Sequence, residues 1–170
     1  MYYFLSYFAI RRTLPSDANP ELQFIVPTGN FGDILAGYYA KRMGLPMGKL
    51  VIATNANDIL TRFWKSGRYE KVDSSLIADA AVGGVVETLS PAMDILVSSN
   101  FERLLWYLAF ESAEGDLREN ACQTVKNWMD QVKSVGRIVV PDSVLELARR
   151  DFMAERVDDN EVRYTFHNMS

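Results

Sequence analysis

Two strand-loop-helix units follow one another in the first part of this 170-residue chain, and they constrain its fold more than any other feature. The first joins a short apolar run, residues 22–26, to a helix predicted over residues 32–43. The second joins the apolar run 50–53 to a helix predicted over residues 59–64. Strands that alternate with helices favour a parallel sheet, whose covered strands read as continuous apolar runs. The sequence therefore predicts an α/β fold: a parallel twisted sheet with helices on both faces.

The remaining elements are read from periodicity and from turn residues. Further along the chain we predict an irregular stretch over residues 66–92, a third strand over 94–97, and helices over 101–110, 117–135 and 144–156. Residues 1–170 are expected to form a single partial domain, with an α/β region over 22–110 and a mainly helical region over 116–170. Both ends are expected to be truncated, because the chain starts on uncapped apolar residues and stops soon after a new helix start.

Composition excludes several classes of function. The net charge is −4 and no basic run occurs, which argues against nucleic acid as a partner, because neutralising phosphates requires a positive field. With one histidine, His167, and one cysteine, Cys122, a zinc cluster or disulfide framework is not expected, and we predict no metal site. The longest apolar stretch, residues 1–10, is far shorter than the roughly 20 residues that span a bilayer. We therefore expect no membrane partner and a cytoplasmic location.

The most specific local feature is the sequence PTGNFGD at residues 27–33, between the first predicted strand and its helix. Gly29 and Gly32 allow a tight turn in which backbone N–H groups approach an anion, and the start of the helix adds unpaired N–H groups. The pattern is neither a Walker loop nor the three-glycine dinucleotide fingerprint. It is also that of an ordinary β-to-α turn in which Asp33 complements the helix dipole. The local pattern leaves both interpretations open.

Three blocks, residues 24–46, 50–70 and 89–105, carry a resemblance to a known family. They read FIVPTGNFGDILAGYYAKRMGLP, LVIATNANDILTRFWKSGRYE and LSPAMDILVSSNFERLL, in that order. Together they resemble the long, fungal and bacterial form of threonine synthase. The resemblance implies an enzyme that depends on pyridoxal 5′-phosphate (PLP), with the tryptophan-synthase-β type of fold. Its implied reaction is that of a carbon-oxygen lyase acting on phosphates, which converts O-phospho-L-homoserine and water to L-threonine and phosphate.

The resemblance also assigns site residues. The residues that match the family's PLP phosphate loop, with the last opening the helix behind it, are Gly29, Asn30, Phe31, Gly32 and Asp33. The family's Schiff-base lysine lies in a Ser/Ala-Phe-Lys-Asp type segment well before this loop, and this chain has no lysine before Thr28. We therefore expect no catalytic residue in this chain, and we expect the 170 residues alone to be inactive.

Polar residues after two other predicted strands are candidate substrate contacts, because strand ends face the ligand crevice in this fold class. Asn55 and Asn57 follow the second predicted strand. Ser99, Asn100 and Arg103 follow the third. Each has a structural alternative: asparagines form such turns for backbone reasons, and the later group suits a helix cap followed by a solvated ion pair.

Two alternatives to threonine synthase activity stay open. One is a related enzyme that acts on another phosphorylated hydroxy-amino acid. The other is a truncated, non-catalytic protein that binds a partner or a small anion. The sequence does not indicate an oligomeric state.

Overall fold

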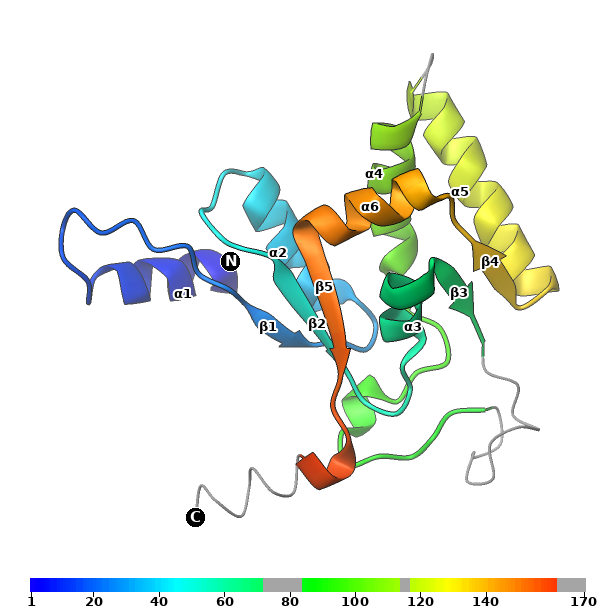
Figure 1. The fold of residues 1–170 in the computed structure, drawn as a ribbon, viewed down its shortest axis with the longest axis horizontal. Helices are drawn as coiled ribbons and strands as arrows, with labels where there is room; N and C mark the ends of the chain where they lie inside the picture. Colours follow the sequence, from blue (N-terminus) through cyan, green and yellow to red (C-terminus); the bar gives the residue numbers. More distant parts are fainter. Residues whose placement is uncertain (72–83, 114–116, 162–170) are drawn as a thin grey trace.

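A computed structural model describes residues 1–71, 84–113 and 117–161. The helices are α1 (Tyr2–Arg11), α2 (Gly32–Arg42), α3 (Ile59–Ser66), α4 (Phe101–Ser112), α5 (Leu117–Ser134) and α6 (Asp142–Asp151), with a 3₁₀ turn, η2 (Pro91–Met93). The strands are β1 (Ile25–Pro27), β2 (Leu50–Thr54), β3 (Arg68–Glu70), β4 (Arg137–Val139) and β5 (Phe152–Arg156). Figure 1 shows strands β1, β2 and β5 side by side.

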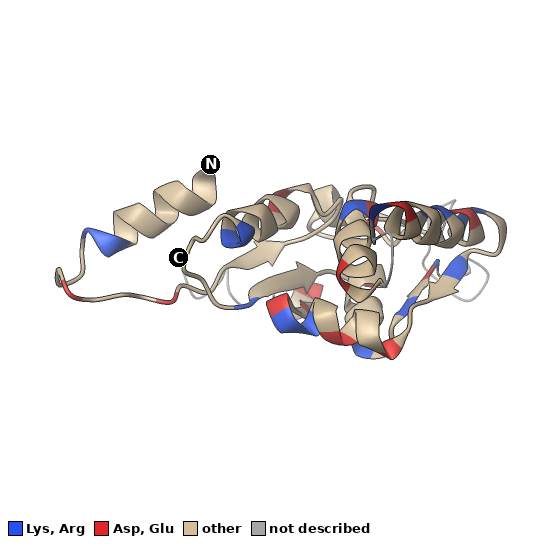
Figure 2. Cartoon of the chain, turned by 90° about the horizontal axis from the view of Figure 1, so that it is seen from above, with Lys and Arg blue, Asp and Glu red and all other residues tan. Residues whose placement is uncertain are grey.

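The three strands form a parallel sheet in the order β1-β2-β5. Ile52 in the central strand β2 lies beside Val26 on one side and Ala154 on the other. Leu50 and Ile52 on one face and Val51 on the other are all buried, as expected for a strand covered on both faces. Seen edge-on in Figure 2, helices lie above and below the strands. The predicted α/β fold with a parallel sheet is confirmed.

The expected strand over residues 94–97 is wrong. These residues follow the turn η2 without entering a strand, and the Asp94 carboxylate accepts hydrogen bonds from the loop after β2. The first strand is displaced as well: β1 starts at Ile25, and Leu22 makes only an isolated bridge to Met47. The second predicted strand is confirmed and extends to Thr54.

The last predicted helix, over residues 144–156, is wrong in its second half. Helix α6 ends at Asp151, and the next five residues form β5, which pairs along the whole of β2. Phe152 and Ala154 are buried while their neighbours are not, which is the period of two expected for a strand. The stretch expected to be irregular also contains β3, which pairs antiparallel with β4, while residues 72–83 lie outside the described residues.

An aromatic cluster ties the sheet to its helices. Phe31, at the start of α2, is 1% exposed, and its ring lies 5.4 Å from that of Phe101, 6.0 Å from that of Phe152 and 6.1 Å from that of Trp64. Phe31 caps α2, and the other three rings come from α3, α4 and β5. The loop before α2 is therefore anchored to a core built from widely separated parts of the chain.

Helix α1 packs on the rest of the molecule through Tyr3 and Tyr7, which are both buried. The opposite side of the helix is apolar and exposed, at Met1, Tyr2, Leu5, Phe8 and Ile10. In Figure 2 this helix carries charge only near its C-terminal end. Among the helices of the described ranges, none combines the length and the apolar character needed to cross a membrane.

Candidate functional site

The loop between β1 and α2 is the centre of the candidate site. Its first residue, Thr28, donates its backbone N–H to the Ala53 carbonyl oxygen of β2 at 2.8 Å, so the loop leaves the sheet in a fixed direction. Phe31 adopts a left-handed conformation with φ 65°, which is uncommon for a side chain of this size. Burial of its ring in the aromatic cluster holds this conformation. The phenyl group therefore faces the core, while the loop backbone stays near the surface at Asn30 and Gly32.

The backbone N–H groups of this loop are available to a ligand. Among the hydrogen bonds between described residues, none uses the N–H of any residue from Gly29 to Ile34 as donor; the first N–H of α2 with a protein partner is that of Leu35, which bonds to the Phe31 carbonyl at 3.1 Å. Consecutive free N–H groups at the start of a helix bind anions, since the helix dipole adds a partial positive charge there. The loop therefore fits a phosphate group.

The carbonyl oxygens of the same loop are held from behind by the segment that leads into α4. The Ser98 hydroxyl donates to the Gly29 carbonyl oxygen at 2.9 Å. Asn100 donates to the Asn30 carbonyl oxygen through its backbone N–H at 3.1 Å and through its side-chain Nδ2 at 2.9 Å. The loop thus presents its donors on one side and has its acceptors satisfied on the other.

Tyr69 holds Ser98 in place. Its phenol oxygen accepts the Ser98 backbone N–H at 2.8 Å, and its ring packs on Phe101 with centroids 4.9 Å apart. Burial raises the pKa of Tyr69 to about 12, an effect that the backbone hydrogen bond to Ser98 partly offsets. The phenol is therefore neutral throughout the physiological range and acts as a fixed hydrogen-bonding group.

Gly29 lies in close contact with η2. A Cβ atom at this position would lie 2.8 Å from the Ala92 carbonyl oxygen and 3.1 Å from the Met93 Cα. Both contacts are with backbone, so a side chain here forces one of two chain segments to move. At Gly32 the nearest such contact is 3.4 Å, to Asn100 Nδ2. Gly29 is thus required for packing, and Gly32 borders the open side of the loop.

Asn55 and Asn57 are brought together with Asp94. The Asp94 Oδ1 atom accepts Asn55 Nδ2 at 2.7 Å and Asn57 Nδ2 at 3.0 Å, and it also accepts the Thr88 hydroxyl at 2.7 Å. Asn57 further bonds both backbone polar groups of Val86, each at 2.8 Å. The two asparagine amides are therefore occupied by protein partners, and they fix the segment that carries η2.

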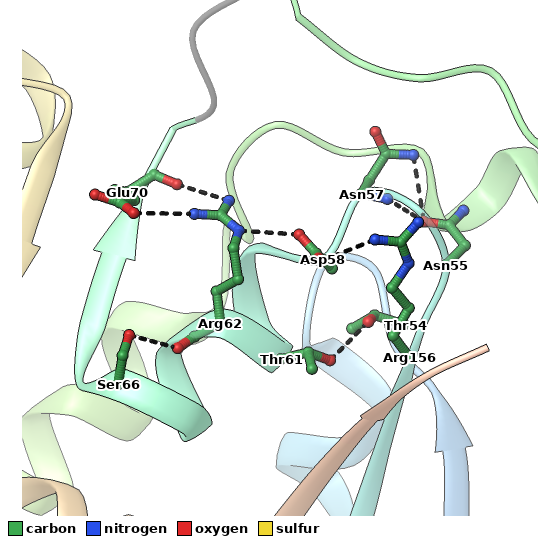
Figure 3. A network of polar contacts seen from close by, with 9 residues as sticks. All are labelled: Thr54, Asn55, Asn57, Asp58, Thr61, Arg62, Ser66, Glu70 and Arg156. Atoms are coloured by element: carbon green, nitrogen blue, oxygen red, sulfur yellow. Dashed lines mark hydrogen bonds and ion pairs between the residues drawn. The ribbon is translucent and has the colours of Figure 1, made fainter. Parts of the chain in front are cut away.

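Charged residues beside these asparagines form a second network (Figure 3). Asp58 lies between two arginines: its Oδ1 is 2.9 Å from Arg62 Nε, and its Oδ2 is 3.4 Å from Arg156 Nη1. Arg62 also reaches Glu70, whose carboxylate is 3.5 Å away and whose backbone oxygen accepts at 2.9 Å. The network joins the loop after β2 to β3 and β5. The cationic head groups of Arg62 and Arg156 are thus directed at protein carboxylates.

The other predicted substrate contacts lie at the start of α4. Ser99 is exposed in the turn between Ser98 and Asn100. Arg103 is exposed one turn into the helix and borders a groove of about 410 Å³ between α4 and α5, which Trp106 and Cys122 also line. Of these three residues, Asn100 is the one that hydrogen-bonds to the loop of residues 29–33.

Two supporting residues were missed by the sequence analysis, Ser98 and Tyr69. Ser98 stands beside Ser99 in the sequence, and nothing in the residue types shows which of the two hydroxyls points inward. Tyr69 falls in a stretch that we expected to be irregular. The only available signal was that the strand-like run 94–97 ends directly before Ser98.

Fold and loop together define a class: a parallel α/β domain with a glycine-containing loop of free backbone N–H groups between its first sheet strand and the following helix. No family model matches the chain. The threonine synthase of Schizosaccharomyces pombe is 55% identical over 161 residues, which cover 94% of this chain and 31% of that protein. The threonine synthase of Saccharomyces cerevisiae is 51% identical over 164 residues, covering 96% and 29%.

Two solved structures agree. The crystal structure of yeast threonine synthase matches with a TM-score of 0.84 at 51% identity, over 96% of this chain and 30% of that one. The PLP-bound threonine synthase of Brucella melitensis matches with a TM-score of 0.73 at 41% identity, over 92% and 28%. The chain is thus homologous to threonine synthases over nearly its whole length, and it spans about 30% of the length of these relatives.

Proposed function

We propose that this chain is the segment of a threonine synthase that binds the phosphate of PLP. The proposed reaction of the whole enzyme converts O-phospho-L-homoserine and water to L-threonine and phosphate. One observation carries the assignment: the free N–H groups from Gly29 onward, at the start of α2. Homology to threonine synthases adds that a PLP-bound relative has the same fold over 92% of the chain.

The proposed phosphate contacts are backbone N–H groups of the loop at Gly29, Asn30, Phe31, Gly32 and Asp33. Backbone N–H donors suit a phosphate dianion because they keep their protons at physiological pH and lie in fixed positions. Bound PLP supplies an electron-withdrawing ring that stabilises negative charge on a substrate carbon. The residues of this chain bind and orient its phosphate. Asp33 is exposed in the first turn of α2, where its negative charge offsets part of the helix dipole.

We further propose that the 170 residues alone do not turn over substrate. The lysine closest in sequence to the loop, Lys41, is engaged elsewhere: its Nζ is 3.1 Å from the Asp151 carboxylate and donates to the Gly48 carbonyl oxygen at 3.1 Å. Covalent attachment of PLP would then come from a lysine outside these residues. Of the predicted substrate contacts, Ser99 and Arg103 keep exposed side chains, and we retain them as candidates.

The cellular setting is also a proposal. The free cysteine, Cys122, is exposed on α5 and suits a reducing compartment such as the cytoplasm. The proposed partner is a small phosphorylated amino acid, and the net charge of −4 disfavours nucleic acid.

A chimera tests the proposed function. The segment of the S. pombe threonine synthase that matches this chain is replaced by the 170 residues, and formation of threonine and phosphate from O-phospho-L-homoserine is measured. We expect an active chimera, and we expect loss of PLP affinity on Gly32→Asp, because a carboxylate then borders the phosphate. The Gly48→Ala chimera is the matched control, since its new Cβ meets nothing closer than 3.7 Å.

The outcomes separate the alternatives. A folded chimera that binds PLP but acts only on another phosphorylated hydroxy-amino acid would shift the assignment to a related enzyme. A folded chimera that binds no PLP would favour a non-catalytic product. If the Gly32→Asp chimera retained full PLP affinity, the phosphate would have to bind elsewhere.

A further inference from the structure

We propose that Ser98 and Asn100 are positioning residues, which orient two peptide groups of the loop so that their N–H groups face the phosphate. This inference rests on the proposed function of the loop. It differs from the sequence-based expectation that Asn100 touches substrate. Ser98 was not among the predicted site residues.

In a trans peptide group the C=O and N–H bonds point in opposite directions. The Gly29 carbonyl accepts the Ser98 hydroxyl at 2.9 Å, so the N–H of Asn30, in the same peptide group, points away from Ser98. The Asn30 carbonyl accepts two hydrogen bonds from Asn100, at 3.1 and 2.9 Å, so the N–H of Phe31 points away from α4. The hydrogen bonds from Ser98 and Asn100 thereby orient two successive donors, the N–H groups of Asn30 and Phe31.

Ser98 has the features of a fixed support. It is 3% exposed, and its backbone N–H is held by the phenol of Tyr69, which is 1% exposed. Because the Ser98 backbone is held in this way, its hydroxyl stays in position to donate to the Gly29 carbonyl oxygen. Its acceptor belongs to Gly29, the residue that also contacts Ala92 and Met93 of η2, so the peptide is restrained from two sides.

The side-chain hydrogen bond of Asn100 indicates that this residue, too, orients the loop. It occupies the N-cap position of α4, where an asparagine side chain ordinarily accepts an N–H from the first turn. Here the side chain makes no such capping bond, and Nδ2 bonds to the Asn30 carbonyl instead. The residue therefore links the start of α4 to the loop before α2. Ser99, between the two supports, is exposed and provides a matched control.

The test is a titration of the ¹⁵N-labelled 170-residue chain with inorganic phosphate, in which NMR spectroscopy follows the amide signals of the loop. We expect the Asn30 and Phe31 amides of the unmodified chain to shift. Ser98→Ala should weaken phosphate binding about fivefold and reduce the response mainly at Asn30, as expected when one positioning hydrogen bond is lost. Asn100→Ala keeps its backbone bond, so we expect a loss of about two- to threefold, mainly at Phe31. Ser99→Ala should behave like the unmodified chain.

The results distinguish the two proposals. If the loop amides of the unmodified chain do not respond to phosphate, the loop is no anion site in this chain, and the proposed function and the inference fall together. If they respond and Ser98→Ala and Asn100→Ala change nothing, or alter all loop amides equally, positioning is refuted while the proposed function stands. Should Ser98→Ala fail to fold, Ser98→Cys decides, because it keeps the volume and weakens the donor. Unchanged phosphate binding by Ser98→Cys would then overturn the inference.

Discussion

Gly29→Ala is the sharpest perturbation of the loop that does not introduce charge. The added Cβ would lie 2.8 Å from the Ala92 carbonyl oxygen, and ordinary contact begins at 3.4 Å, so the two segments must separate by about 0.6 Å. Neither segment moves freely. The loop is held by Ser98, and the residues after η2 are held through Asp94 by Asn55. We therefore expect strain in both.

Overpacking of this kind costs about 1–3 kcal/mol, and contact with two backbone atoms places Gly29→Ala near the middle, at about 2 kcal/mol. For a chain of this length that lowers Tm by about 4–8 °C. Phosphate affinity should fall as well, because the peptide that carries the Asn30 N–H moves with Gly29. Thermal unfolding followed by circular dichroism measures the first effect, and the phosphate titration measures the second.

Gly48→Ala is the control, since its Cβ would meet the Glu21 side chain at an ordinary 3.7 Å. It should leave Tm unchanged or raise it slightly, because alanine reduces the entropy of the unfolded chain. A Gly29→Ala chain that melts within 1 °C of the Gly48→Ala chain and keeps its phosphate affinity would refute the close packing of the loop on η2.

The remaining predictions address the supports of the site and the surface of α1. Asp94→Ala leaves several polar partners without an acceptor and should destabilise the chain by about 2–4 kcal/mol in urea unfolding, whereas an unchanged midpoint would contradict the network. Burial raises the pKa of Tyr69 to about 12, so its contribution to stability is complete below the unfolded-state pKa near 10 and is lost as pH rises toward 12. Tyr69→Phe should flatten this decline in stability at alkaline pH, and an unchanged slope would contradict the role of Tyr69. In Gly37→Ala the new Cβ would lie 2.7 Å from the Tyr3 ring, so we expect faster amide exchange throughout α1, and native protection would disprove that contact. We expect the exposed apolar side of α1 to make the isolated chain self-associate, so Phe8→Glu should lower the sedimentation coefficient without lowering Tm, and a chain that is monomeric before the change, or equally associated after it, would contradict this expectation.

Much of the fold could be predicted because the early strands are continuous apolar runs and their helices carry clear stop signals. Strand β2 and helix α4 are near their expected positions for this reason. Strand β5 could not be predicted, because Phe152 and Ala154 continue the apolar spacing of α6 and only pairing with β2 makes them extended. Residues 94–97 show the reverse: they have strand-like composition, but they form no strand, and the hydrogen bonds of Asp94 tie their first residue to Asn55 and to Thr88.

In the candidate site, too, features set by local sequence could be predicted and features set by contacts across the fold could not. The loop over residues 29–33 can be proposed from the sequence because glycine spacing and a helix start are local properties. Its supports cannot, because they depend on which side chains meet across the fold. Ser98 and Ser99 are chemically identical neighbours, and only the chain direction before α4 turns one hydroxyl toward Gly29 and the other to solvent.

Binding and turnover place different demands on this chain. Each support that we describe for the loop belongs to it: Ser98 and Asn100 behind the carbonyl oxygens, Tyr69 behind Ser98, and Asp94 behind η2. An anion-binding loop needs only such local restraint, because its donors are backbone groups. The proposed chemistry also needs a lysine that attaches PLP, which we place outside these residues. We therefore expect the isolated chain to bind phosphate through the loop without forming threonine, so that affinity and activity respond separately to changes in the loop and in the rest of the enzyme.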